Sequence, residues 1–423
     1  MDKILAIAVF ALCYAGIILK KDKKEIIVIL SVALLFILRI VSFDDAYNMI
    51  NWRVIAIFTG TFLVAEVFTG SGVPLWFADH LVNRSRNVGL AFLFIVIITG
   101  VLSGFLENVT TVLIMAPIAF ALCERQKISP VNVLIGLAVS SNLQGTATLI
   151  GDSPSIILGS FADMGFNDFF FFRGRPGIFF AVEVGAVVSF IFLYMYFRKY
   201  KANITKFTPP HISDWIPTGL LFGLIATLIV VSYIYKENKD MLGYVCLGFG
   251  LLAIIWESLG RAEMTLKTYI KKFDWHTLIF LLSIFILIGA LTKTGLINDL
   301  GRFMASKLYG NNFIAFTVIV WMSVVFSAFI DNVPYVLAML PAVKTFAVAV
   351  NALPYVFYFG LLIGASIGGN ITPIGASANV VAIGLLKKKG YAVSFWEFVK
   401  IGFPFTILAT GASYIFLWIF WRI

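Results

Sequence analysis

Charged residues are scarce in this sequence. They make up 13% of the 423 residues, and 60% are hydrophobic, whereas an ordinary soluble domain has about 25% charged and about 45–50% apolar residues. A soluble protein of this length needs a polar surface that the chain cannot supply. The mean hydropathy of +0.96 therefore predicts a protein embedded in a lipid bilayer.

Cysteine and histidine are also rare, with three of each. Cys13, Cys123 and Cys246 form no CxxC pair and no metal-binding spacing, so we interpret them as buried free thiols. The GxxxxGK[ST] motif of nucleotide-binding loops is absent from the sequence. We expect no metal site built from His and Cys, no cofactor and no enzymatic activity.

The net charge of +10 does not point to nucleic acid, because the basic residues lie in short clusters between apolar segments. With the N-terminus outside, the cytoplasmic loops would be 20–25, 79–88, 124–130, 198–214, 260–274 and 386–401. These loops hold 20 of the 32 Lys and Arg residues. We therefore predict a multi-pass protein of the plasma (cytoplasmic) membrane with both termini outside.

Some apolar segments are interrupted by polar residues. The uninterrupted candidates for spans are 4–19, 26–43, 54–70, 177–197, 215–235, 241–259, 275–292 and 402–421. Glycine, proline and hydroxyl residues interrupt 131–162 and 355–385. A carboxylate lies near the middle of both 88–123 and 312–350, each of which is either two full spans or one re-entrant hairpin.

The interrupted segments repeat. Shifting the sequence by 224 aligns 103–117 with 327–341, with eight of fifteen positions identical, and 145–153 with 369–377, with five of nine identical. The chain is thus predicted to be a duplication of 1–205 and 212–423. If 88–123 and 312–350 are hairpins, each half has about five spans, and an odd number inverts the second half.

The predicted fold class is therefore an all-α polytopic membrane protein with two inverted repeats. The first repeat would contain the hairpin 88–123 and the broken helix 131–162. The second would contain the hairpin 312–350 and the broken helix 355–385.

Glu107 and Asp331 occupy equivalent hairpin tips. A carboxylate inside a membrane segment costs about 2.5–3.5 kcal/mol on insertion scales, so its presence suggests a function. The alternative is that each carboxylate merely caps the helix that follows it. We favour function, because Glu is a poor cap and yet stands at the matching place. Both residues are placed to exchange a proton for a cation.

The broken helices predict a binding site near the middle of the membrane. Freed carbonyls can bind a cation there, and helix N-termini can face an anion or a polar solute; the alternative is a simple kink. The candidate binding residues are Glu107, Asn108, Thr110, Asn142, Gly145, Thr146, Thr148, Asp152, Ser153, Asp331, Asn332, Gly369, Asn370, Thr372, Ser377 and Asn379. Within this set, a Na⁺ ion could be held at Asn108, Gly145, Asn332 and Gly369.

The motifs at 106–111, 141–154, 330–334 and 368–379 resemble the ion transporter superfamily, in particular its group of arsenite efflux permeases, P protein and sodium/proton antiporters. The resemblance implies two inverted repeats and a mobile transport domain beside a scaffold, which is an elevator-type transporter. A homodimer and a soluble ATPase partner are compatible with it. The dicarboxylate branch carries Ser-Asn-Thr at the tips, whereas this chain has Glu-Asn-Val and Asp-Asn-Val.

The first functional prediction is a proton-coupled secondary antiporter that exports arsenite or antimonite. A Na⁺/H⁺ antiporter is the alternative, and a cation-coupled permease for dicarboxylates or other anions comes third, because two acidic tips repel an anion. The expected partners are the lipid bilayer, a small inorganic ion or oxyanion as substrate, and H⁺ or Na⁺ as coupling ion, with no nucleic acid. A channel would not need duplicated sites with titratable tips.

Overall fold

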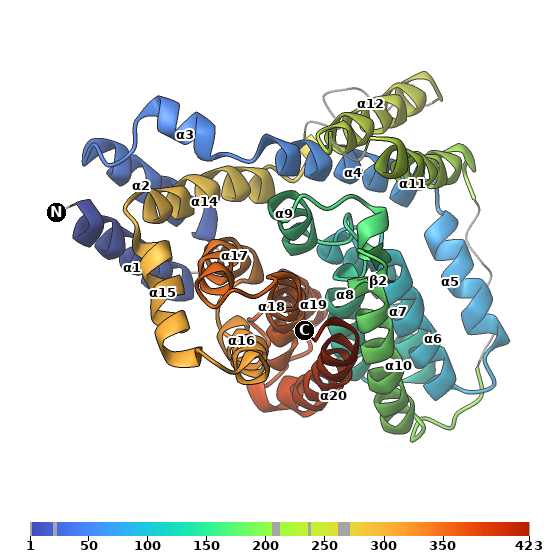
Figure 1. The fold of residues 1–423 in the computed structure, drawn as a ribbon. Helices are drawn as coiled ribbons and strands as arrows, with labels where there is room; N and C mark the ends of the chain where they lie inside the picture. Colours follow the sequence, from blue (N-terminus) through green and yellow to red (C-terminus); the bar gives the residue numbers. More distant parts are fainter. Residues whose placement is uncertain (1, 20–22, 205–211, 236–237, 261–270, 423) are drawn as a thin grey trace.

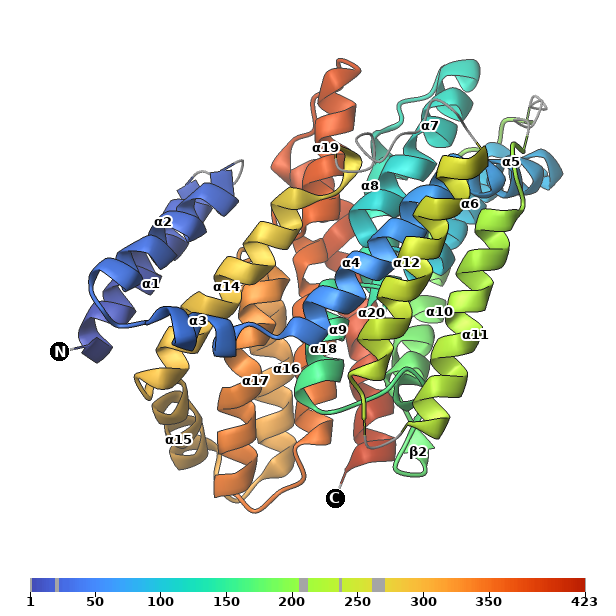
Figure 2. The same cartoon turned by 90° about the horizontal axis from the view of Figure 1, so that it is seen from above.

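The structure is a computed structural model that describes residues 2–19, 23–204, 212–235, 238–260 and 271–422 (Figures 1 and 2). The described part is mostly helical, with one short antiparallel pair of strands, β1 (Phe171–Phe172) and β2 (Arg175–Pro176). Eight of the described helices are long and apolar enough to cross a membrane. The expected boundary between the halves, and parts of the basic loops at 20–25, 198–214 and 260–274, lie outside the described residues.

The helices follow the expected order. Those of the first half are α1 (Asp2–Leu19), α2 (Lys24–Ile37), α3 (Phe43–Met49), α4 (Trp52–Gly70), α5 (Val73–Arg84), α6 (Val88–Ser103), α7 (Asn108–Gln126), α8 (Val131–Gly145), α9 (Ser153–Phe161), η2 (Asn167–Phe169) and α10 (Ile178–Phe197). Those of the second half are α11 (Ile216–Ile234), α12 (Met241–Gly260), α14 (Trp275–Lys293), α15 (Leu296–Leu308), α16 (Asn312–Ser327), α17 (Asn332–Ala349), α18 (Tyr355–Gly368), η3 (Gly369–Ile371), α19 (Ser377–Lys388) and α20 (Phe395–Trp421).

The four interrupted segments break where the sequence predicts. Non-helical turns separate α6 from α7 and α16 from α17, and short loops separate α8 from α9 and α18 from α19. The pieces α8, α9, α18 and α19 have 15, 9, 14 and 12 residues, fewer than the roughly 20 that a full span needs. In Figure 2 the α7–α8 connection lies at the upper end of the molecule and the α17–α18 connection at the lower end.

The broken helices of one half pack against elements of the other. Helix α19 contacts α7 and α8, and α9 contacts α17 and α18. Every residue of α8 except Asn132 is buried, so its non-helical end is enclosed by protein. This enclosure is the condition under which irregular backbone is tolerated at membrane depth.

Glycines allow the loops after α8 and α18 to turn back on themselves. A Cβ atom on Gly151 would overlap the carbonyl oxygen of Gly145, and one on Gly375 would overlap that of Gly369. The two pairs are related by the same shift that aligns the two halves of the sequence. The chain therefore turns equally tightly at the corresponding break of each half.

The segment 26–43, expected as one apolar span, was predicted wrongly at its C-terminal end. Helix α2 ends at Ile37, and Arg39 adopts a left-handed φ of 56°. A new helix, α3, then starts with a capping box between Ser42 and Asp45. Hydrogen bonds from Lys293 and Ser42 hold the pKa of the Asp45 carboxyl below its usual range. The turn between α2 and α3 therefore carries charged groups.

The two arms of each hairpin differ in length. Helices α7 and α17 have 19 and 18 residues, whereas the first arms, α6 and α16, have 16 each. Helix α7 ends at Gln126, and the residue that follows it, Lys127, has a left-handed φ of 51°. By length alone, therefore, the first arms are the shorter ones.

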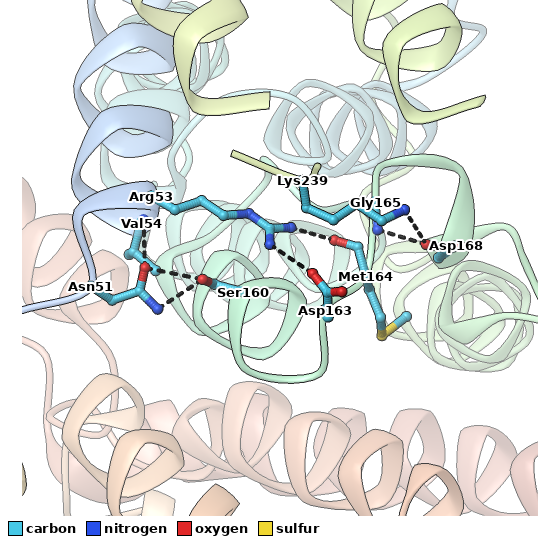
Figure 3. A network of polar contacts seen from close by, with 9 residues as sticks. All are labelled: Asn51, Arg53, Val54, Ser160, Asp163, Met164, Gly165, Asp168 and Lys239. Carbon is cyan, nitrogen blue, oxygen red and sulfur yellow. Dashed lines mark hydrogen bonds and ion pairs between the residues drawn. The ribbon is translucent and has the colours of Figure 1, made fainter. Parts of the chain in front are cut away.

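Polar contacts attach the end of α9 to the start of α4 (Figure 3). The Arg53 guanidinium pairs with Asp163 at 3.2 Å and donates to the Met164 carbonyl at 2.7 Å. The Asn51 amide donates to the Ser160 hydroxyl at 2.7 Å. These bonds join the short second piece of a broken helix to a long spanning helix.

Helix α4 packs very closely along α12, and this contact can be tested. A Cβ atom on Gly60 of α4 would overlap the backbone of Cys246 in α12. Gly248, also in α12, has open space around the position of a Cβ atom. We expect Gly60→Ala to lower the free energy of unfolding by about 1–3 kcal/mol through overpacking, and Gly248→Ala to have little effect. Thermal unfolding in detergent measures both. Equal stability of the two variants would contradict the close approach.

Candidate functional site

The two hairpin tips and the two breaks meet at a cavity of about 50 Å³. Eight of the sixteen predicted binding residues line it, from both halves of the chain. They are Glu107, Asn108, Asn142, Asp152, Ser153, Asp331, Asn332 and Ser377. The remaining lining includes Thr277 and Phe280 of α14, which the sequence analysis did not single out.

The acidic tips act as helix caps and also line the cavity. The Glu107 Oε2 atom accepts a hydrogen bond from the Val109 amide at 2.7 Å, and Asp331 Oδ1 accepts one from the Val333 amide at 3.2 Å. The two interpretations that the sequence left open are thus compatible. One oxygen of each carboxylate caps a helix, and the positive N-terminal ends of α7 and α17 face the cavity.

The most important residue that the sequence analysis missed is Lys24. Its ammonium group lies 2.9 Å from Asp331 Oδ2, 3.3 Å from the Ser377 hydroxyl and 4.6 Å from the centre of the Phe280 ring. Lys24 starts α2, and its sequence pattern marks it only as part of a basic loop cluster. No spacing rule distinguishes it from its neighbour Lys23, so only the fold shows that it enters the site.

Threonines tie each break to its hairpin tip. The Thr148 hydroxyl donates to the Gly104 carbonyl, and at the matching place in the second half the Thr372 hydroxyl donates to the Ala328 carbonyl. Both threonines are buried and lie outside the cavity lining. Their bonds satisfy carbonyl groups that the helix ends leave without partners.

Amide side chains connect the two halves beside the cavity. The Asn142 amide donates to Asn370 Oδ1 at 2.7 Å and to Asn379 Oδ1 at 3.0 Å. The Asn108 amide donates to Asn142 Oδ1 at 3.3 Å, and the Ser103 hydroxyl donates to Asn108 Oδ1 at 2.7 Å. This buried network therefore fixes the position of Asn108 and Asn142 on the cavity wall.

Four predicted residues lie behind the lining. Gly145 gives the Asn108 side chain room, because a Cβ atom there would overlap Asn108 Oδ1. The Thr146 hydroxyl donates to the Asn142 carbonyl at 3.2 Å, and the Gly369 carbonyl accepts from the Asn379 amide at 2.9 Å. The backbone of Thr110 faces the Glu107 carboxylate.

The cavity carries more negative than positive groups. Glu107, Asp152 and Asp331 line it, and Lys24 is the only Lys or Arg among its lining residues. No group of three or more His, Cys, Asp or Glu side chains in the described ranges could hold a metal ion. The arrangement suits a small polar solute or a monovalent cation bound by carboxylate, amide and hydroxyl groups.

The model of a protein family described as citrate transporters matches residues 14–360. The chain is 31% identical to an uncharacterized transporter of Mycobacterium bovis, over 98% of each chain. It is 27% identical to an uncharacterized transporter of Synechocystis, over 94% of each. It is also 26% identical to the human P protein, over 98% of this chain and 59% of that one.

Two solved structures share the fold. The YdaH transporter of Alcanivorax borkumensis superposes with a TM-score of 0.61 at 12% identity, covering 87% of this chain and 84% of that one. MtrF of Neisseria gonorrhoeae, described as one of a class of antimetabolite efflux pumps, superposes with a TM-score of 0.57 at 13% identity, covering 90% and 83%. The match to the family model and the similarity over the whole chain show that this protein is a membrane transporter of the citrate transporter family within the ion transporter superfamily.

Proposed function

We propose that the protein is a proton-coupled secondary active transporter whose substrate binds between the two acidic tips. The observation that carries this proposal is the presence of Glu107 and Asp331, from opposite halves, on the wall of one cavity. Titratable groups beside a substrate site allow proton release to be coupled to substrate binding. The first substrate we propose is arsenite or antimonite, exported in exchange for protons.

The charge of the cavity supports a neutral or cationic substrate. Three carboxylates and one ammonium group line it, so an anion would enter against a net negative field. A neutral hydroxide such as arsenite can instead be held by the amides of Asn108 and Asn142 and the hydroxyl of Ser377. All three of these side chains lie on the wall.

The fold supports alternating access by an elevator mechanism. We propose that 1–205 and 212–423 are inverted repeats. The bonds of Thr148 and Thr372 recur at matching places in the two halves, and the chain enters α8 from the upper end of the molecule and α18 from the lower end (Figure 2). Helices α6–α10 and α16–α20 pack together, while α4 with α11 and α12, and α2 with α1 and α14, pack around them (Figure 1). The first group would be the mobile transport domain, in a plasma membrane with both termini outside.

Two other substrates are favoured by specific observations. Na⁺/H⁺ exchange is favoured because Asp331 already holds a cation, the Lys24 ammonium group, at 2.9 Å. Citrate or another carboxylate is favoured by the description of the family. Such an anion would have to enter with cations or protons that offset the carboxylates.

Removal of the acidic tips tests the proposed coupling. We expect Asp331→Asn and Glu107→Gln each to abolish proton-coupled flux in proteoliposomes, because neither amide can exchange a proton. Glu124→Gln, at the exposed C-terminal end of α7, is the matched control and should transport normally. Wild-type coupled flux in both tip variants would show that the tips are only caps.

A flux panel distinguishes the substrates. Proteoliposomes with an imposed pH gradient are offered arsenite, antimonite, Na⁺, Li⁺, citrate and succinate in turn. We expect proton-driven arsenite or antimonite flux. Proton-driven Na⁺ flux alone would select the second candidate, and carboxylate flux that requires a co-transported cation would select the third. Gradient-independent unitary currents would contradict a transporter.

Lys24 offers a further test, because its ammonium group competes for Asp331. We expect Lys24→Met to reach half-maximal transport at a coupling-ion concentration about tenfold lower, which corresponds to about 1.4 kcal/mol. Lys24→Arg keeps the charge and should stay near wild type. An unchanged or higher half-saturating concentration in Lys24→Met would contradict the competition.

A further inference from the structure

Two buried side-chain clusters near the cavity occupy equivalent places in the two halves but differ in chemistry. We name them the hydroxyl cluster and the amide cluster. The hydroxyl cluster consists of Thr146, Asp152, Ser155 and Ser366. The amide cluster consists of Asn370, Ala376, Asn379 and Asn142. The shift of 224 relates each residue of the amide cluster to one residue of the hydroxyl cluster. Each cluster includes one residue of the other half, Ser366 in the hydroxyl cluster and Asn142 in the amide cluster.

The amide cluster satisfies its own hydrogen bonds. The nitrogen of Asn142 lies between the side-chain oxygens of Asn370 and Asn379, at 2.7 and 3.0 Å. The nitrogen of Asn379 donates to two backbone carbonyls, each at 2.9 Å. A positively polarised N–H group thus fills the space between two oxygens, and no carboxylate is present among these four residues.

The hydroxyl cluster has unsatisfied oxygens at the same place. Asp152 Oδ1 caps α9 by accepting from the Ser155 amide at 2.8 Å, but Oδ2 is buried and has no hydrogen-bond partner among the described residues. The hydroxyl oxygens of Ser155 and Ser366 are also buried and without a partner in that part of the chain. The exposed fractions of these three residues are 2% or less.

These hydroxyl groups share one neighbour, the Asp152 carboxyl group. The hydroxyl groups of Ser155, Ser366 and Thr146 all approach the Asp152 carboxyl group. By the shift between the halves, Ser366 corresponds to Asn142, so the hydroxyl cluster has a hydroxyl group, which can donate or accept, where the amide cluster has an amide nitrogen. The Thr146 hydroxyl uses its proton on the Asn142 carbonyl, which leaves its lone pairs available.

We propose that one Na⁺ ion binds in the hydroxyl cluster, at the place that the Asn142 nitrogen occupies in the amide cluster. Its side-chain ligands would be Asp152 Oδ2 and the hydroxyl oxygens of Thr146, Ser155 and Ser366.

The chemistry of the cluster selects a hard monovalent cation. All of its ligands are oxygens, which suit hard cations rather than soft ones. The single carboxylate balances one positive charge, and a buried unpaired carboxylate is costly. Asp152 also lines the cavity between the tips, so the cluster lies next to the proposed substrate site. The role of this Na⁺ as a coupling or exchanged ion rests on the proposed function, whereas the binding site itself does not.

Binding is measured on the purified full chain in detergent, without transport. Radiolabelled sodium should bind to the wild type, and Na⁺ but not choline should raise Tm. We expect Asp152→Asn to lose both effects, and Ser366→Ala to weaken binding by about tenfold. Ser366→Asn should fold and lose Na⁺ binding, because its amide imitates Asn142 and donates to the oxygens that would hold the ion.

Each result supports or overturns the site. A wild type that binds no Na⁺ would mean that Asp152 holds a proton, and would overturn the proposal regardless of how the variants fold. Unchanged binding in Asp152→Asn would also overturn it. Asp331→Asn should keep Na⁺ binding while losing transport. If instead the wild type binds Na⁺ but proton-coupled flux survives in the tip variants, the proposed function fails and the site stands.

Discussion

The architecture depends on how backbone and amide groups find partners where water is excluded. Two helices stop inside the molecule, and their last carbonyls and the loops that follow must be paired within the protein. Asn379 donates to two carbonyls after α18, and Thr148 and Thr372 donate to carbonyls at the ends of α6 and α16. The Asn142 amide joins the two halves through oxygens of Asn370 and Asn379. The bonds of Asn142 therefore connect the end of α8 to the break of the other half.

This pairing has a consequence for charge. Because the amides of Asn108, Asn142 and Asn379 donate to the backbone and to each other, they are not available to the carboxylates of the tips. Glu107 and Asp331 each use one oxygen on a helix N-terminus, and Asp331 takes its remaining partner from Lys24 of α2. An ammonium group from a surrounding helix thus meets a carboxylate of the proposed mobile domain. That contact would have to open when the domain moves.

Most of the fold could be predicted from the sequence, because membrane segments are defined by composition and the breaks by clustered Gly, Pro and hydroxyl residues. The hairpin tips could be found through the internal repeat, since Glu107 and Asp331 align with each other when the halves are superposed in sequence. Lys24 was missed because a lysine at the end of an apolar segment has the same pattern whether it faces water or a buried carboxylate. Likewise, Ser155 and Ser366 matter only through the absence of partners among the described residues, which composition and spacing do not show.

The central claim is that the hairpin tips line a water-accessible chamber, and cysteine accessibility measures it directly. The native cysteines are buried, which shields them from the reagent, and they are replaced by alanine before single cysteines are introduced. Asn332 lies on the cavity wall, whereas Val325, which is 54% exposed, lies on the outer surface of α16, where lipid would cover it. We expect a membrane-impermeant thiol reagent to modify Asn332→Cys in proteoliposomes, substrate to slow this reaction, and Val325→Cys to stay unmodified. If Asn332→Cys stays unreactive from both sides of the membrane, the tips do not line a water-accessible chamber.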